Sequence, residues 1–257
     1  MSRVDALVER LLRLERPLLI ALDVDGTISP IVRDPDKAEI PSKTLAILAA
    51  LSEAPGTELA LVTGRDLRSL RRMERLEGVW RAVEHGGVVL GPNEEVRERR
   101  LNEAQRTALE RFKEWADTHA HDAFIEYKPQ AIAVHVRAIA MRDPERAERL
   151  MDEADTLAQH LGLHVRRGKA LREAEAVPND KGRALQEIFE RSRARSVLFI
   201  GDDLTDFPAI ELAAEHGVGV FVQSPEQRGA PSRSAVVLDG IDEVVAVLRR
   251  LLEGIRH

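Results

Sequence analysis

The chain has 257 residues, and its 38 basic and 44 acidic side chains give a formal net charge of −6, which fits one large domain or two modest ones. Hydrophobic residues make up 44% and charged residues 32% of the chain, so the composition excludes a disordered or collagen-like protein. Cysteine is absent, which excludes a thiol nucleophile, a disulfide framework and any cysteine-ligated metal site.

Residues 1–16 carry acidic side chains among apolar positions at helical spacing, which predicts an amphipathic helix and not a signal peptide. No apolar run approaches the roughly 20 residues that span a bilayer. No block of like charge indicates an arm that binds nucleic acid. We therefore expect a cytoplasmic protein, most simply a monomer, that binds neither a membrane nor nucleic acid.

Short apolar runs alternate with helical patterns along the two ends of the chain. The apolar runs end abruptly in polar or glycine residues, and they lie at residues 17–22, 58–62, 196–200 and 217–222. The helical patterns lie at residues 42–54, 66–76, 182–192, 207–216 and 242–252. This alternation predicts a doubly wound α/β fold with a buried parallel sheet. Ligands of such sheets bind at the carboxyl edge of the strands.

The middle of the chain has a different pattern. Its elements follow an αββαββ order, with helices near 101–121 and 143–161 and strands near 124–128, 131–137, 163–167 and 170–173. That order predicts an inserted α+β module with an antiparallel sheet. We place the module at residues 94–176, between a core made of residues 1–93 and 177–257. The expected joints are the Gly91–Pro92–Asn93 turn and Pro178–Asn179.

The motif Asp23–Val24–Asp25–Gly26–Thr27 follows directly after the first apolar run. Two carboxylates two residues apart at a strand end can face one small site, and Gly26 lets the chain turn back with its amides pointing inward. One carboxylate can attack phosphorus while the other transfers protons. Mg²⁺ would neutralise the phosphoryl oxygens. A surface turn rich in Asp and Gly is the alternative.

Three further motifs fall at the ends of apolar runs or at a helix start: TGR at 63–65, NDKG at 179–182 and GDDLTD at 201–206. They offer a hydroxyl, further carboxylates and Lys181, one of only six lysines, at a helix N-terminus that favours a phosphate. Each has an alternative: Asp206 as a helix cap, Lys181 in solvent, Thr63 as a sheet residue. All alternatives together would require several coincidences at element ends.

The order DVDGT, TGR, NDKG and GDDLTD resembles the four motifs of the haloacid-dehalogenase-like phosphohydrolases, and the sequence is most similar there to trehalose-6-phosphate phosphatases. The resemblance extends from about residue 18 to residue 252. It implies a Rossmann-like core with an inserted α+β cap domain. It also implies a Mg²⁺-dependent phosphatase whose substrate is a small sugar phosphate, trehalose 6-phosphate, and whose intermediate is an aspartyl-phosphate.

The resemblance also implies roles for residues of the core. Asp23 matches the nucleophile and Asp25 the general acid and base. The phosphate-binding residues are Thr63, Lys181, Gly26 and Thr27. Mg²⁺ is held by the carboxylate of Asp23, the backbone carbonyl of Asp25 and Asp202, with Asp203 and Asp206 as supporting acidic residues.

The cap domain of this family covers the site and reads the sugar. The segments 126–128 and 135–137 and a later Glu173 are similar to its signature of Glu-x-Lys, His-x-Arg and Glu. Strand alternation would direct Glu126 and Lys128 to one face, and His135 and Arg137 likewise on the next strand. Cross-strand pairing of exposed charges is the alternative. The predicted substrate-binding residues are Arg65, His85, Glu126, Lys128, His135, Arg137 and Glu173.

Some residues leave the role of His85 and the identity of the sugar open. His85, in a Glu-His-Gly-Gly segment that also resembles the family, either positions substrate or is a structural histidine in a turn. The family commonly has Arg-Pro where this chain has Glu175–Ala176, and Thr-Asp-Glu where it has Thr205–Asp206–Phe207. The sugar could therefore differ, as in a sucrose phosphate or a glycosyl-phosphoglycerate. A receiver-type phosphoacceptor domain is disfavoured by Asp25 and by the large insertion.

Overall fold

The computed structural model describes residues 2–256 except 33, 97–100, 129, 169, 179 and 225–234. The chain divides into two compact units, the first made of residues 1–98 and 179–257 and the second of residues 99–178. At the first expected joint, the turn closes within the first unit, where the N–H of Glu94 donates to the carbonyl of Gly91 at 2.9 Å. At the second, Asn179 lies outside the described residues.

The first unit is built on a seven-stranded sheet. In spatial order its strands are β11 (Val236–Asp239), β10 (Gly217–Gln223), β9 (Ser196–Gly201), β1 (Leu18–Leu22), β2 (Thr57–Val62), β3 (Trp80–Val83) and β4 (Val88–Leu90). Neighbouring strands pair in parallel, except β3 with β4. The central strand β1 is buried along its whole length between β9 and β2.

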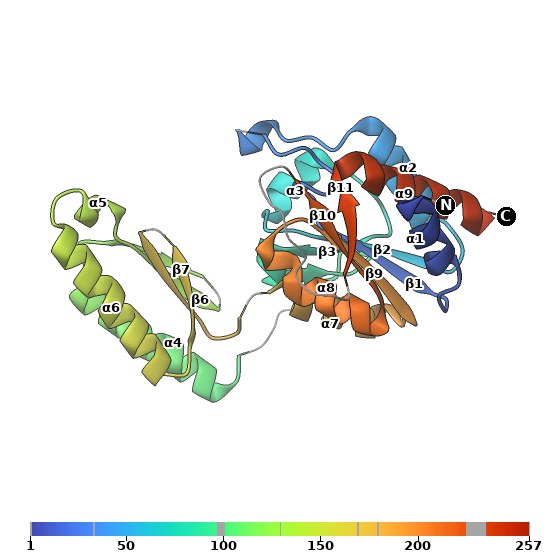
Figure 1. Ribbon diagram of the computed structural model, residues 1–257. Coiled ribbons are helices and arrows are strands. Elements are labelled where there is room, and N and C mark those ends of the chain that lie inside the picture. The colour runs from blue at the N-terminus through green and yellow to red at the C-terminus, as the bar shows by residue number, and fades with distance from the viewer. Residues whose placement is uncertain are drawn as a thin grey trace. The chain divides into compact units, whose positions relative to one another are not determined.

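Helices cover both faces of this sheet (Figure 1). One face packs against α1 (Arg3–Leu12), α2 (Ser42–Ser52), α3 (Leu67–Met73) and α9 (Gly240–Arg256), and the other against α7 (Lys181–Ser192) and α8 (Phe207–His216). Strand β1 supplies Leu18, Ile20 and Leu22 to the first apolar cluster and Leu19 and Ala21 to the second. This alternation buries both of its faces, so the predicted doubly wound architecture is confirmed.

The second unit is an antiparallel sheet with helices on one face. Its elements are α4 (Glu103–His119), β5 (Phe124–Tyr127), β6 (Ala131–His135), α5 (Arg137–Ala140), α6 (Pro144–His160), β7 (His164–Gly168) and β8 (Leu171–Glu175). The strands lie in the order β5-β6-β8-β7, and α4 and α6 pack against one side (Figure 1). The predicted α+β composition is confirmed, with the short helix α5 in addition. Pro129 of the predicted hairpin turn lies outside the described residues.

The prediction missed strands β3, β4 and β11. Strand β3 is only four residues long and contains Arg81, which breaks the apolar pattern that indicates a buried strand. Arg81 is nevertheless buried, since its guanidinium pairs with Glu74 at 2.8 Å and donates to the carbonyls of Val79 and Leu76. The described part of the first unit also contains three short 3₁₀ helices, η1 (Pro35–Lys37), η2 (Glu84–Gly86) and η3 (Leu204–Asp206).

Within the described residues, the helices are each too short or too polar to cross a bilayer.

Candidate active site

The carboxyl edge of the parallel sheet holds a pocket of about 580 Å³ in the first unit. Asp23 follows β1, Thr63 follows β2 and Asp202 follows β9. Because these three strands are neighbours and run in parallel, their ends meet at one place. The predicted residues that line the pocket are Asp23, Asp25, Thr63, Arg65, His85, Lys181, Asp202 and Asp203.

Lys181 is the centre of the pocket's buried charge. Its ammonium lies 2.7 Å from Asp23 Oδ1 and 2.7 Å from Asp206 Oδ1, and its side chain is only 3% exposed. The lysine begins α7, whose first turn is capped by Asp180. Burial lowers the pKa of Lys181, but the charges of Asp23 and Asp206 outweigh burial and raise it above its ordinary value. The ammonium therefore stays charged.

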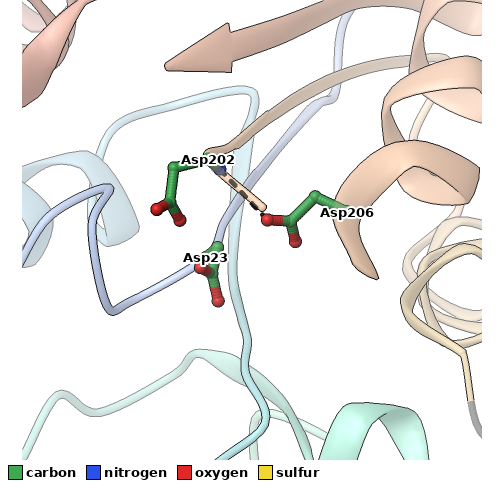
Figure 2. Close-up of side chains that lie close together, drawn as sticks. All are labelled: Asp23, Asp202 and Asp206. Carbon is green, nitrogen blue, oxygen red and sulfur yellow. Dashed lines mark hydrogen bonds between the residues drawn. The ribbon is translucent and has the colours of Figure 1, made fainter. Parts of the chain in front are cut away.

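Asp206 fixes the loop that follows β9. Its Oδ2 accepts the backbone N–H groups of Asp202 and Asp203, each at 3.0 Å, while its Oδ1 accepts Lys181. Figure 2 shows Asp206 beside Asp23 and Asp202, with the bond to the Asp202 backbone drawn. Both carboxylate oxygens of Asp206 thus accept hydrogen bonds, and its supporting role at a metal site stays a prediction.

Three buried carboxylates gather here. Oxygens of Asp23, Asp202 and Asp206 lie within 4.8 Å of one another. Burial, and then the charge of Asp206, raises the pKa of Asp202 to about 6, and burial raises the pKa of Asp23 well above its ordinary value. One lysine does not balance three carboxylates, so the cluster favours a further cation. Oxygen donors of this kind suit a hard divalent ion.

The carboxylate of Asp25 turns to Arg65 instead of joining this cluster. Arg65 Nε donates to Asp25 Oδ2 at 2.6 Å and Arg65 Nη2 to Asp25 Oδ1 at 2.7 Å. Such a two-pronged contact fixes the plane of the carboxylate. The hydrogen bond to Asp25 raises the pKa of Arg65. The sequence predicts that Arg65 binds substrate. In the structure its guanidinium contacts Asp25, the predicted general acid and base.

The turn after β1 packs against the carboxylate cluster. Gly26 has a φ of +79°, and a Cβ atom there would lie 2.0 Å from Asp202 Oδ2, so both the backbone and the space require glycine. Thr27 is fully buried, and its hydroxyl lies 3.5 Å from Asp202 Oδ1. The structure thus places the Thr27 side chain on Asp202, and phosphate binding by Gly26 and Thr27 stays a prediction.

His85 lies in a strained turn beside Thr63. Glu84, His85 and Gly86 all have positive φ, at 54°, 56° and 92°, which is costly for the two residues that carry side chains. The N–H of His85 donates to the carbonyl of Thr63 at 3.0 Å, and a Cβ atom on Gly64 would lie 2.5 Å from His85 Cε1. Gly64 therefore makes room for the imidazole in the pocket.

Ser224 is a pocket residue that the sequence analysis missed. It follows β10, which pairs in parallel with β9. The signal that could have identified it is its position after the apolar run at 217–222, because that run ends at the same sheet edge as the run before Asp202.

In the second unit, four of the five predicted sugar-binding residues share one face of the sheet. His135 Nε2 lies 3.2 Å from Glu126 Oε2, and Lys128 Nζ donates to Glu173 Oε1 at 2.5 Å. Arg137 does not alternate with His135 on a strand, so that prediction is wrong. Strand β6 ends at His135, and Arg137 is an exposed residue that begins α5.

The family model described as trehalose-phosphatase matches residues 21–209, which contain the whole buried cluster. The chain belongs to the trehalose-phosphatase family. Trehalose-phosphate phosphatase of Mycobacterium tuberculosis is 27% identical over 250 residues, covering 93% of this chain and 62% of the relative. An uncharacterized glycosyl hydrolase of the same species is 32% identical over 268 residues, covering 97% of this chain and 20% of the relative. The chain therefore spans between one fifth and about three fifths of these relatives.

The structure of Aspergillus fumigatus trehalose-6-phosphate phosphatase matches with a TM-score of 0.73 at 25% identity and covers 98% of each chain. The predicted haloacid-dehalogenase-like core with an inserted α+β unit is confirmed. At the position where the trehalose phosphatases commonly have Glu, the ring of Phe207 packs edge-on against Phe221 with centroids 5.8 Å apart. The carboxylate cluster is formed with phenylalanine at this position.

Proposed function

We propose that the protein is a phosphatase that hydrolyses trehalose 6-phosphate to trehalose and phosphate. The observation that carries this proposal is Asp23 at the end of the central strand, buried against Lys181 and beside Asp202, in a chain of the trehalose-phosphatase family. Ligands of open parallel sheets bind outside the carboxyl ends of the strands, and Asp23 lines the pocket at that edge.

The proposed reaction consists of two displacements at phosphorus. In the first, a carboxylate oxygen of Asp23 forms a bond to phosphorus, the bond from phosphorus to the sugar oxygen breaks, and Asp25 gives that oxygen its proton. In the second, water forms a bond to phosphorus, the acyl-phosphate bond breaks, and Asp25 takes the proton of the water. Lys181 holds Asp23 in place, and Arg65 orients Asp25.

The donor set fits Mg²⁺. Asp23 and Asp202 would hold the ion together with the backbone carbonyl of Asp25, and Asp203 and Asp206 would support them. The fit rests on three buried carboxylates, those of Asp23, Asp202 and Asp206. Their combined negative charge exceeds the single positive charge of Lys181. When bound, Mg²⁺ neutralises charge on the phosphoryl oxygens.

The second unit would recognise the sugar. Glu126, Lys128, His135 and Glu173 present hydrogen-bonding groups on one side of the sheet, which suits a ligand rich in hydroxyls. We also propose that Arg137, which is exposed at the start of α5, binds the sugar.

A related substrate is the second candidate, because the Arg of the family's Arg-Pro pair is replaced here by Glu175, which is buried beside Arg166. The test measures phosphate release from trehalose 6-phosphate, sucrose 6-phosphate, a glycosyl-phosphoglycerate and an aryl phosphate, with Mg²⁺ and with chelator. We expect the highest kcat/KM on trehalose 6-phosphate and none of this activity in chelator. Preference for another sugar would overturn the substrate. No release from any compound would overturn the phosphatase.

A further inference from the structure

Arg166 lies in a row of residues that crosses the sheet of the second unit. Glu126 on β5 is opposite Ala133 on β6, Ala133 is opposite Glu173 on β8, and Glu173 is opposite Arg166 on β7. Residues directly opposite each other point to the same side of a sheet. The row therefore places Arg166 on the face that carries the proposed sugar-binding residues, although the family signature does not include it.

The opposite face shows the contrast. Arg167, the next residue on β7, pairs with Asp155 of α6 at 2.9 Å, and Ile132 and Val134 of β6 pack into the apolar cluster with the helices. Arg166 and Arg167 are thus two neighbouring arginines of the same strand on opposite faces. One is bound to the helix layer, and the other lies beside Glu173.

Two buried carboxylates hold the guanidinium of Arg166. Its Nη2 lies 2.9 Å from Glu175 Oε1 and its Nη1 lies 3.9 Å from Glu173 Oε2. Each glutamate side chain is only 5% exposed, whereas that of Arg166 is 40% exposed. The arginine is therefore the part of this group that faces solvent, with its orientation fixed from below.

Lys128 completes the arrangement from the other side of β6. Its ammonium reaches across that strand to Glu173 Oε1, which is possible because β6 presents only the small side chains of Ala131 and Ala133 on this face. Glu173 consequently has a cation on each oxygen. A guanidinium has five N–H donors, so Arg166 keeps donors for a ligand while it binds the two glutamates.

From this placement we propose that Arg166 contacts the sugar part of the substrate, donates to its hydroxyl oxygens and helps to determine specificity. The inference rests on the proposed function, because it takes the substrate to be a disaccharide phosphate. Glu175 is the positioning residue that holds Arg166 in this orientation. A merely structural Arg166 would instead neutralise the two buried glutamates and touch no ligand.

The test compares Arg166→Met with Arg167→Met, which removes an equal charge from the opposite face. We expect Arg166→Met to lower kcat/KM on trehalose 6-phosphate at least tenfold and to change turnover of an aryl phosphate less than twofold. Arg167→Met should leave both rates near the parent's. An equal loss on both substrates, or no loss, would overturn the proposal.

A charge-balanced variant separates the two roles of Arg166. In Arg166→Met combined with Glu175→Gln, one cation and one anion are removed together, so a neutralising role would be restored and a sugar contact would not. We expect the double variant to stay impaired on trehalose 6-phosphate, and recovery would refute the contact. Arg166→Lys keeps the positive charge and therefore controls for poor folding of the Met variant. It should lose part of the activity on the sugar phosphate and keep its activity on the aryl phosphate.

Assays of the parent enzyme distinguish a failure of this inference from a failure of the proposed function. A parent that acts on an aryl phosphate but not on trehalose 6-phosphate would refute the substrate. The Arg166 variants are then assayed on the preferred sugar phosphate of the panel, where the same split between sugar and aryl substrates is expected.

Discussion

The first unit buries the charged cluster of its candidate site, whereas the second unit presents several of its candidate sugar-binding charges on a partly exposed sheet face. Asp23, Lys181 and Asp206 are at most 4% exposed and come from segments far apart in the sequence. The side chains of Glu126 and His135 are 44% and 34% exposed and pair across neighbouring strands. Buried charges that share partners depend on one another, whereas exposed pairs contribute little to stability.

This contrast suggests a division between chemistry and selection. Changes in the buried cluster should affect every substrate and, where they unbalance charge, the fold. Changes on the sheet face of the second unit should affect only substrates that carry the sugar. The following experiments compare the two regions on a sugar phosphate and an aryl phosphate.

The largest effect is expected from Asp23→Asn. The amide keeps the shape of the side chain but removes the nucleophile, so kcat should fall below about 1% of the parent's on both substrates. The exposed Asp242→Asn is the control and should leave the rates unchanged. Phosphate release measures the effect, with mass spectrometry to exclude deamidation. Turnover above a few per cent would contradict a covalent role for Asp23.

Lys181→Met should abolish activity and also destabilise the fold. The change leaves Asp23 and Asp206 buried without their shared cation, which costs about 3–5 kcal/mol in the free energy of unfolding. Urea unfolding measures this loss, with the exposed Lys43→Met as the control. If Lys181→Met and Lys43→Met were equally stable, the buried cluster would not depend on this lysine for its charge balance.

Arg65→Ala should reduce kcat about 100-fold on both substrates, because Asp25 loses the contact that orients it and proton transfer typically contributes 10²–10⁴-fold. The exposed Arg68→Ala is the control. Steady-state assays on the two substrates decide the role of Arg65. A loss confined to the sugar phosphate would show that Arg65 reads the sugar, as the sequence predicted, and does not act through Asp25.

Glu126→Ala should cost about tenfold in kcat/KM on trehalose 6-phosphate, or about 1.4 kcal/mol of transition-state stabilisation, and should spare the aryl phosphate. Glu148→Ala, on the exposed side of α6, provides the control. Equal losses on both substrates would mean that Glu126 supports the second unit's fold instead of binding sugar.

The smallest effect is a pH dependence of Mg²⁺ binding. Burial and Asp206 raise the pKa of Asp202 from 3.8 to about 6, and the ion binds the deprotonated form. Between pH 7 and pH 5.5 the apparent dissociation constant for Mg²⁺ should therefore rise about fourfold, measured by calorimetry. Because the folded pKa is the higher one, this group's contribution to metal-free stability is lost as pH rises through about 6.

A matched variant tests the assignment of this titration. Asp202→Asn should bind Mg²⁺ more weakly at both pH values and should lose the fourfold dependence. If the dependence persisted in Asp202→Asn, another group would be responsible for it.

The core site was predictable because a buried parallel strand ends where an apolar run of the sequence gives way to polar or glycine residues. Asp23, Thr63 and Asp202 each follow an apolar run, and the geometry of a parallel sheet brings such ends together. The pairing of Arg65 with Asp25 was not predictable, because both side chains can point in several directions from their loops. The structure supplies that direction, and the catalytic roles of these residues remain predictions.

The second unit was less predictable in detail. Alternation correctly placed Glu126 and Lys128 on one face, but it failed at Arg137, where the chain begins α5 directly after β6. The partnership of Arg166 with Glu173 and Glu175 depends on the register of β7 against β8. A sequence does not reveal register when the turn that sets it is unknown.

The second unit is an insertion of about 80 residues within the chain of the first. The entropic cost of closing a loop grows by only about 0.6 kcal/mol for each doubling of its length. Replacing the insertion with a linker of about ten residues would therefore change the closure cost by only about 2 kcal/mol. Genetic recombination at these two boundaries would thus exchange the proposed sugar-binding unit at little entropic cost to the folding of the first unit.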